Sequence, residues 1–93
     1  MKYYALFYSY VDDYLTRRTQ FREEHLKRAN DLHKRDQLIL AGVCSDPFYQ
    51  ALLIFKVDDK SVIEDFIKND PYVNNGIVTK WEIKEMMVGI GNK

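Results

Sequence analysis

The order of two kinds of apolar pattern constrains the fold of this chain more than any other feature. Four segments carry strand-like apolar runs, and two segments between them place apolar side chains at the helical period of about 3.6 residues. The strand-like segments cover residues 3–10, 38–44, 51–57 and 78 onward, and the helical segments cover residues 16–35 and 61 to the proline at 71. The predicted order is therefore strand, helix, strand, strand, helix, strand.

Local signals support both helices and the turn between the middle strands. The first helix has an apolar stripe formed by Phe21, His25, Ala29 and Leu32. The second helix begins at Ser61 and Glu64, which have the spacing of a capping box, and Pro71 ends it. Turn residues at 45–47 make the second and third strands a predicted hairpin.

This element order is typical of the ferredoxin-like split βαβ arrangement, an α+β fold. It predicts a four-stranded antiparallel sheet with both helices on one face. The other face would expose apolar side chains of the first three strands to water, and a two-fold homodimer with its sheets packed face to face would cover them. No repeat or linker divides the chain, so we expect residues 1–93 to form one domain.

Composition excludes several classes of function. The 14 Lys and Arg residues balance 14 Asp and Glu residues, so no basic surplus indicates a nucleic-acid partner. The third strand, Ala51–Val57, also lacks the Gly-aromatic-Gly signature of RNA-recognition domains. The 46% hydrophobic content with zero net charge argues against a disordered chain.

The cellular setting follows from the apolar runs and from Cys44. The longest apolar run, Leu38–Cys44, is far shorter than the roughly 18 residues that suggest a membrane span. A single cysteine excludes an internal disulfide and a thiolate zinc site. We therefore expect a cytoplasmic protein without membrane contact, and we expect Cys44 to be a small buried hydrophobe rather than a nucleophile.

The two histidines give the best indication of chemistry. His25 and His33 are eight residues apart, about 12 Å along a helix, which is too far to share one metal ion, so no metal site is predicted. His25 on the apolar stripe is either a core histidine or a general acid/base. A histidine base needs an orienting carboxylate, and Asp70 is the best candidate because Pro71 disfavours helical geometry for it. The alternative is that Asp70-Pro71 only stops the helix.

Short motifs in this order resemble the YCII-related domain family. They are Arg22-Glu23-Glu24-His25-Leu26, Leu40-Ala41-Gly42, Asp70-Pro71-Tyr72-Val73-Asn74-Asn75-Gly76-Ile77 and Trp81-Glu82-Ile83. The resemblance runs from the first strand to the last. It implies a ferredoxin-like fold that dimerises into an α+β barrel, with His25 and Asp70 as an active-site pair. Many members carry a longer loop after the second strand, whereas Ala41-Gly42 is followed here by the short Val43–Pro47, so this loop's substrate contacts do not carry over.

Two functions of different class remain open at this point. The first is a cofactor-independent enzyme that isomerises, eliminates or hydrolyses a small, partly apolar or aromatic compound by proton transfer at His25. Arg22, one turn before His25, would bind a substrate oxyanion or carboxylate, and aromatic residues, Tyr4 and Tyr72 or Phe7, would line the cleft. The second is a non-catalytic homodimeric module that binds a small ligand or is purely structural, with His25 and Asp70 as a buried polar pair.

Overall fold

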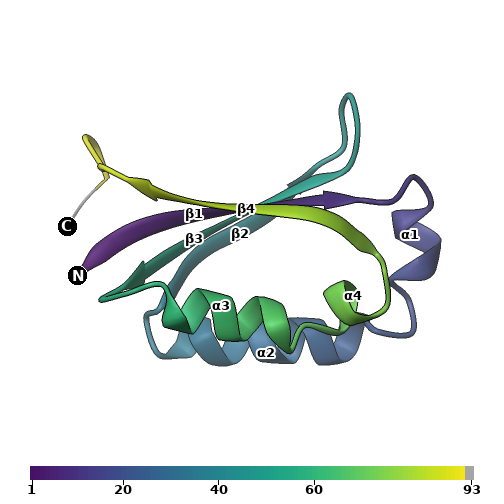
Figure 1. Ribbon diagram of the computed structural model, residues 1–93, viewed down its shortest axis with the longest axis horizontal. Coiled ribbons are helices and arrows are strands. Elements are labelled where there is room, and N and C mark those ends of the chain that lie inside the picture. Colours follow the sequence, from purple (N-terminus) through teal and green to yellow (C-terminus); the bar gives the residue numbers. More distant parts are fainter. Residues whose placement is uncertain (92–93) are drawn as a thin grey trace.

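The computed structural model, which describes residues 1–91, has the predicted order of strands and main helices (Figure 1). Two helices of only four residues, α1 and α4, are added to this order. The elements are β1 (Lys2–Tyr10), α1 (Tyr14–Arg17), α2 (Arg22–Lys34), β2 (Leu38–Cys44), β3 (Gln50–Val57), α3 (Ser61–Lys68), α4 (Pro71–Asn74) and β4 (Val78–Met86). The sheet order is β2-β3-β1-β4 with antiparallel neighbours, which confirms the ferredoxin-like α+β fold.

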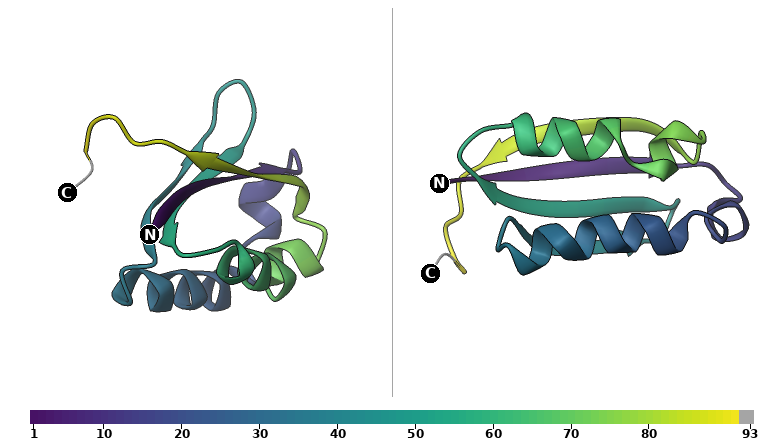
Figure 2. Two further views of the ribbon diagram at one scale, coloured as in Figure 1. Left: turned by 60° about the vertical axis from the view of Figure 1, so that its left-hand side comes forward. Right: turned by 90° about the horizontal axis from the view of Figure 1, so that it is seen from below.

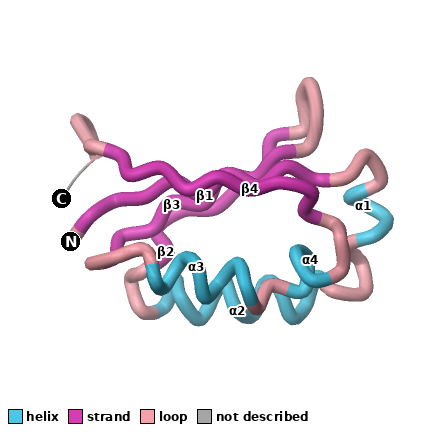
Figure 3. The backbone as a smooth tube through the Cα atoms, viewed as in Figure 1, coloured by secondary structure: helices cyan, strands magenta, loops and turns pink. Residues whose placement is uncertain are grey.

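The molecule has two layers, a sheet and a layer of helices. Helices α2 and α3 lie side by side against one sheet face, and α4 continues the line of α3 (Figure 2). The tube view shows that all four strands belong to the other layer and that no helix covers their far side (Figure 3). The hairpin that joins β2 and β3 projects beyond the sheet on this uncovered side.

The strand register places the core on the helix-covered face. Tyr4, Leu6 and Tyr8 alternate along β1 and are buried, and the buried residues of β3 alternate in the same way. Tyr8 pairs with Ala51 of β3 and Trp81 of β4. Because side chains alternate between faces with a period of two, these residues share the face that α2 and α3 cover.

The opposite face is partly apolar and is open in the single chain. Phe7 of β1 and Leu52 and Ile54 of β3 are half-buried there, and Leu40 of β2 is 63% exposed. The register pairs Phe7 with Leu52 and Leu40 with Ile54, so these side chains form one patch, which we call the open face. The sequence predicted such a face.

The prediction of one helix over residues 16–35 is wrong at its start. The chain forms α1, then turns through residues 18–21, and α2 begins at Arg22. Tyr14 anchors α1 because it is buried and stacks on Tyr10 with ring centroids 4.0 Å apart. Residues 16–20 offer no apolar side chain to the core, so no packing stabilises a continuous helix there.

The predicted capping box at Ser61 and Glu64 does not form. Lys60 is the N-cap residue of α3, and its side chain makes no capping hydrogen bond. The Asp59 carboxylate instead accepts hydrogen bonds from the backbone N–H and the hydroxyl of Ser61, which hold the pKa of Asp59 below its usual value. A charged acceptor two residues upstream thus takes the hydroxyl that the sequence pattern assigned to capping.

Cys44 is exposed rather than buried. It is the last residue of β2 and pairs with Gln50, the first residue of β3. The apolar character of residues 38–44 had indicated burial. However, only Leu38 of this strand is buried in the single chain.

Candidate active site

Asp70 is the centre of the candidate site and is fully buried between α3 and α4. Its backbone is extended, with φ −77° and ψ 121°, as the following proline favours. Asp70 is therefore the N-cap residue of α4 with Pro71 in the first turn, and its side chain accepts a hydrogen bond from the backbone N–H of Tyr72 at 3.0 Å. Pro71 thus does more than end a helix, because it starts a second one that fixes the carboxylate.

Three donors satisfy the buried carboxylate. His25 Nδ1 lies 2.9 Å from Oδ1, which also accepts from the N–H of Tyr72. The hydroxyl of Tyr8 donates to Oδ2 at 2.9 Å. Donors of this kind favour the ionised form of a carboxyl group, which burial alone would penalise. The sequence analysis did not single out Tyr8, which is one of several aromatic residues in the first predicted strand.

His25 lies in the first turns of α2 and directs one ring nitrogen at Asp70. A carboxylate only accepts, so Nδ1 carries the proton and donates it, which fixes the tautomer of the neutral ring. Nε2 makes no hydrogen bond within residues 1–91, and no buried side-chain nitrogen or oxygen there lacks a partner. Nε2 is therefore accessible, although His25 as a whole is only 9% exposed.

A cavity of about 140 Å³ adjoins His25. Small and apolar side chains from α2, β2 and β3 form much of its wall, and aromatic and arginine side chains complete it. The lining residues are Tyr10, Tyr14, Arg18, Arg22, His25, Leu26, Ala29, Ala41, Gly42, Val43, Ala51, Leu53 and Tyr72. A mostly apolar pocket with a few convergent polar groups is the usual form of a small-molecule site.

Tyrosines surround the His25–Asp70 pair and remain protonated at neutral pH. Burial is the main cause that raises the pKa of Tyr8, with Asp70 adding to it, and burial also raises the pKa of Tyr10. Burial raises the pKa of Tyr72 to about 12, even though Arg18 and Arg22 lower it. All three phenols are thus neutral and able to donate a hydrogen bond in the neutral pH range.

Most of the side chains that the sequence singled out come together here. Arg22, His25 and Tyr72 line the cavity, and Asp70 lies behind His25. Tyr4 lies elsewhere: it is buried in the core four residues before Tyr8 on β1, and it does not line this cavity. Phe7, the alternative, is on the open face.

His33 has a structural partner of its own. Its Nδ1 lies 2.7 Å from the backbone oxygen of Leu38, which can only accept, so this nitrogen carries a proton. Within residues 1–91, no group of three His, Cys, Asp or Glu side chains is arranged to hold a metal ion. No helix in this part of the chain is long and apolar enough to cross a membrane.

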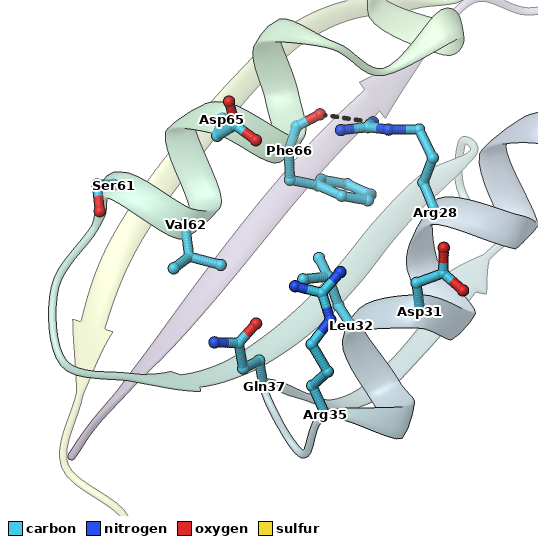
Figure 4. A pocket seen from close by; sticks show the side chains of 9 residues that line it. All are labelled: Arg28, Asp31, Leu32, Arg35, Gln37, Ser61, Val62, Asp65 and Phe66. Carbon is cyan, nitrogen blue, oxygen red and sulfur yellow. Dashed lines mark hydrogen bonds between the residues drawn. The ribbon is translucent and has the colours of Figure 1, made fainter.

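A larger cavity, of about 540 Å³, lies between α2 and α3 and has a different chemistry (Figure 4). Charges of both signs line it, from Arg28, Asp31, Arg35 and Asp65, and no histidine or cysteine does. Arg28 is already engaged, because its guanidinium donates to the backbone oxygen of Phe66 at 2.9 Å, the dashed line in Figure 4. The histidine–aspartate pair therefore adjoins the smaller cavity and not this one.

The fold and the site define a small ferredoxin-like α+β domain with a buried histidine–aspartate pair beside an apolar pocket. The chain belongs to the YCII-related domain family, whose sequence model matches residues 1–87. This confirms the resemblance that the motifs indicated. No curated protein matches the chain.

A solved structure gives an independent view of the fold. The structure of 5-chloro-2-hydroxyhydroquinone dehydrochlorinase (TftG) from Burkholderia phenoliruptrix AC1100, in complex with 2,5-dihydroxybenzoquinone, superposes with a TM-score of 0.81. The match covers 98% of this chain and 99% of the dehydrochlorinase chain, at 15% sequence identity. At that identity, the likeness establishes a shared fold.

Proposed function

We propose that this protein is an enzyme that moves a proton on a small, partly apolar or aromatic compound, with His25 as general acid/base. One observation carries the proposal: Asp70 engages Nδ1 of His25 and leaves Nε2 free beside the cavity. A neutral imidazole held in this tautomer accepts a proton at Nε2, and the adjacent carboxylate stabilises the imidazolium that results. Asp70 is then a positioning residue.

The rest of the cavity fits the charge that such a step creates. Removal of a proton next to a carbonyl leaves an enolate, and removal from a hydroxyl leaves an oxyanion. Arg22 lies one helical turn before His25, lines the same cavity and is the residue that would bind this oxygen. Tyr72, stacked on the imidazole, limits the positions that the ring can take.

Isomerisation, elimination and hydrolysis all fit this arrangement. The name of the structural neighbour is that of an enzyme that removes chloride from a hydroxylated hydroquinone, and its bound compound is a dihydroxybenzoquinone. These words describe that protein. They support hydroxylated quinones and hydroquinones as the first compounds to test with this chain.

The test is an NMR pH titration of both imidazoles in the wild-type protein and in Asp70→Asn. We expect His25 to titrate reversibly and its midpoint to move to lower pH in the variant, because the imidazolium loses its carboxylate partner. His33 is the control within the chain, since its partner is the backbone oxygen of Leu38. A thermal melt of Asp70→Asn shows whether the variant remains folded.

The two functions predict different outcomes. If the protein is an enzyme, 2,5-dihydroxybenzoquinone shifts the His25 resonances of the wild-type protein. Any substrate that the wild-type protein converts is no longer converted by His25→Gln. An imidazole that does not titrate, or whose titration midpoint is the same in folded Asp70→Asn, contradicts acid/base catalysis at His25. Either of these results would replace the enzyme with a binding or structural role.

We infer further that the protein acts in the cytoplasm as a homodimer. The open face supports the dimer, because it joins apolar side chains of β1, β2 and β3 that the single chain leaves in contact with water. A second copy packed sheet to sheet would cover it. The lone Cys44 is typical of a protein from a reducing compartment.

A further inference from the structure

Arg18 is an arginine of the cavity that the acid/base step does not use. It lies in the turn between α1 and α2 and is half-buried. Its guanidinium donates to the hydroxyl of Tyr14 at 3.0 Å and lies 4.9 Å from the centroid of the same ring. Tyr14 is itself buried and stacked on Tyr10. A neutral side chain therefore holds this cation in place.

The positive charge of the cavity is not balanced. No carboxylate lies within ion-pair distance of Arg18 or Arg22 among residues 1–91, where the ion pairs are Lys2–Glu85, Lys84–Glu82 and His25–Asp70. The cavity wall contains no aspartate or glutamate. Asp70, behind His25, already accepts from three donors. Two guanidinium groups thus line one small cavity without a counter-charge, and such groups suit carboxylates.

The size of the cavity limits what else the ligand contains. Its volume of about 140 Å³ is close to that of an apolar protein cavity, about 150 Å³, that accepts a benzene molecule. The small side chains of Ala29, Ala41 and Ala51 contribute to its wall, and aromatic rings complete it. One six-membered ring is enough to fill this space.

We propose that Arg18, held by Tyr14, is a second anion-binding residue of this cavity and that the ligand is a single-ring compound with a carboxylate substituent. This inference rests on the proposed function only in placing the ligand beside His25. The two arginines then have separate tasks: Arg22, on the helix of His25, faces charge that develops during the reaction, and Arg18 binds charge that the ligand carries throughout.

The test compares benzoate with benzamide, which has the same ring and nearly the same shape without the charge. We measure affinity for the folded full chain by NMR titration at one fixed salt concentration. Wild type is expected to bind benzoate at least tenfold more tightly than benzamide. Arg18→Gln should weaken benzoate binding about tenfold and change benzamide binding less than twofold, because only benzoate loses a charged partner.

Two further variants complete the design. Lys27→Gln removes the same charge from an exposed position on α2 outside the cavity, and should change benzoate binding less than twofold. Tyr14→Phe keeps the ring but removes the hydroxyl that orients Arg18, so benzoate binding should weaken by a few fold. Equal affinity for benzoate and benzamide, or an unchanged benzoate affinity in folded Arg18→Gln, overturns the proposal.

The inference and the proposed function fail in different ways. Benzoate could bind through Arg18 while the titration midpoint of His25 is the same in wild type and in Asp70→Asn. In that case the anion site stands and the enzyme is excluded. If His25 titrates and responds to Asp70 but benzoate has no advantage over benzamide, the carboxylate ligand is excluded and the acid/base pair stands.

Discussion

The imidazole of His25 lies face to face with the ring of Tyr72, with centroids 3.9 Å apart and an interplanar angle of 8°. Tyr72 follows Asp70 by two residues, and Asp70 is the N-cap residue of the helix that carries Tyr72. One short segment therefore supplies both the hydrogen-bond partner and the stacking partner of the histidine. A displacement of α4 would disturb both contacts together.

Two variants of Tyr72 separate its ring from its hydroxyl, which makes no hydrogen bond within the described chain. Tyr72→Phe keeps the stack, so we expect the free energy of unfolding to change by less than about 1 kcal/mol. Tyr72→Leu loses the stack as well and should be less stable than Tyr72→Phe by about 0.5–1.5 kcal/mol. Urea denaturation measures both, and equal stabilities would show that the stack contributes nothing.

The hydroxyl of Tyr8 is the donor to the second oxygen of Asp70. Tyr8→Phe leaves this buried oxygen without a partner, which should lower the free energy of unfolding by about 1–3 kcal/mol. Without the Tyr8 donor, less of the negative charge on the Asp70 carboxylate is compensated. This favours the imidazolium form of His25, so the midpoint of the His25 titration should move to higher pH. NMR titration and urea denaturation measure the two effects.

Tyr4→Phe is the matched control for Tyr8→Phe. Tyr4 is buried on the same face of β1, but its hydroxyl does not bond to Asp70. The His25 titration should therefore stay at its wild-type midpoint. A similar shift in both variants would mean that the change comes from altered core packing and not from the lost hydrogen bond.

The sequence predicted the fold well because the fold depends on patterns. The apolar runs over residues 3–10 and 51–57 and the helical stripe from Phe21 to Leu32 each predict an element, and β1, β3 and α2 form over these segments. The missed break between α1 and α2 depends instead on one tertiary contact, the stack of Tyr14 on Tyr10. A contact between two individual side chains leaves no periodic signal in the sequence.

The site was predictable only in part for the same reason. A histidine on an apolar stripe and an aspartate before proline made His25 and Asp70 candidates, and the resemblance to the YCII-related family selected them as a pair. Tyr8 is 62 residues away from Asp70 in the sequence, and Tyr4 has an equally apolar setting on the same strand. Only the register of β1 and the position of α4 decide which of these tyrosines meets the carboxylate.

Alkaline pH should destabilise the protein steeply. Tyr8, Tyr10 and Tyr72 have pKa values raised by burial, so the folded state keeps protons that the unfolded state begins to lose near pH 10. Their contribution is complete below pH 10 and is lost as the pH rises beyond it, by about 1.4 kcal/mol per pH unit for each tyrosine. Urea denaturation at intervals of roughly half a pH unit, from about pH 9 to about pH 11.5, measures how steeply the free energy of unfolding falls with pH.

Tyr10→Phe provides the check on this slope. Phenylalanine has no proton to lose, so the unfolding free energy should decline less steeply above pH 10. The reduction in slope corresponds to at most one fewer proton released on unfolding. Thr79→Ser, which keeps a hydroxyl on exposed β4 and adds no titrating group, should leave the slope as it is. An unchanged slope in Tyr10→Phe would rule out the ionisation of Tyr10 as a contribution to it.

The open face should hold two copies of the chain together. Leu52 is half-buried at its centre and pairs with Phe7, so a lysine there would place a charge inside a sheet-to-sheet interface. We expect a dimer for wild type and a monomer for Leu52→Lys in sedimentation velocity at micromolar concentration. Leu15→Lys makes the same change on α1, where the leucine is 50% exposed and away from the open face, and should remain dimeric. A well-folded wild-type monomer at that concentration would contradict the dimer.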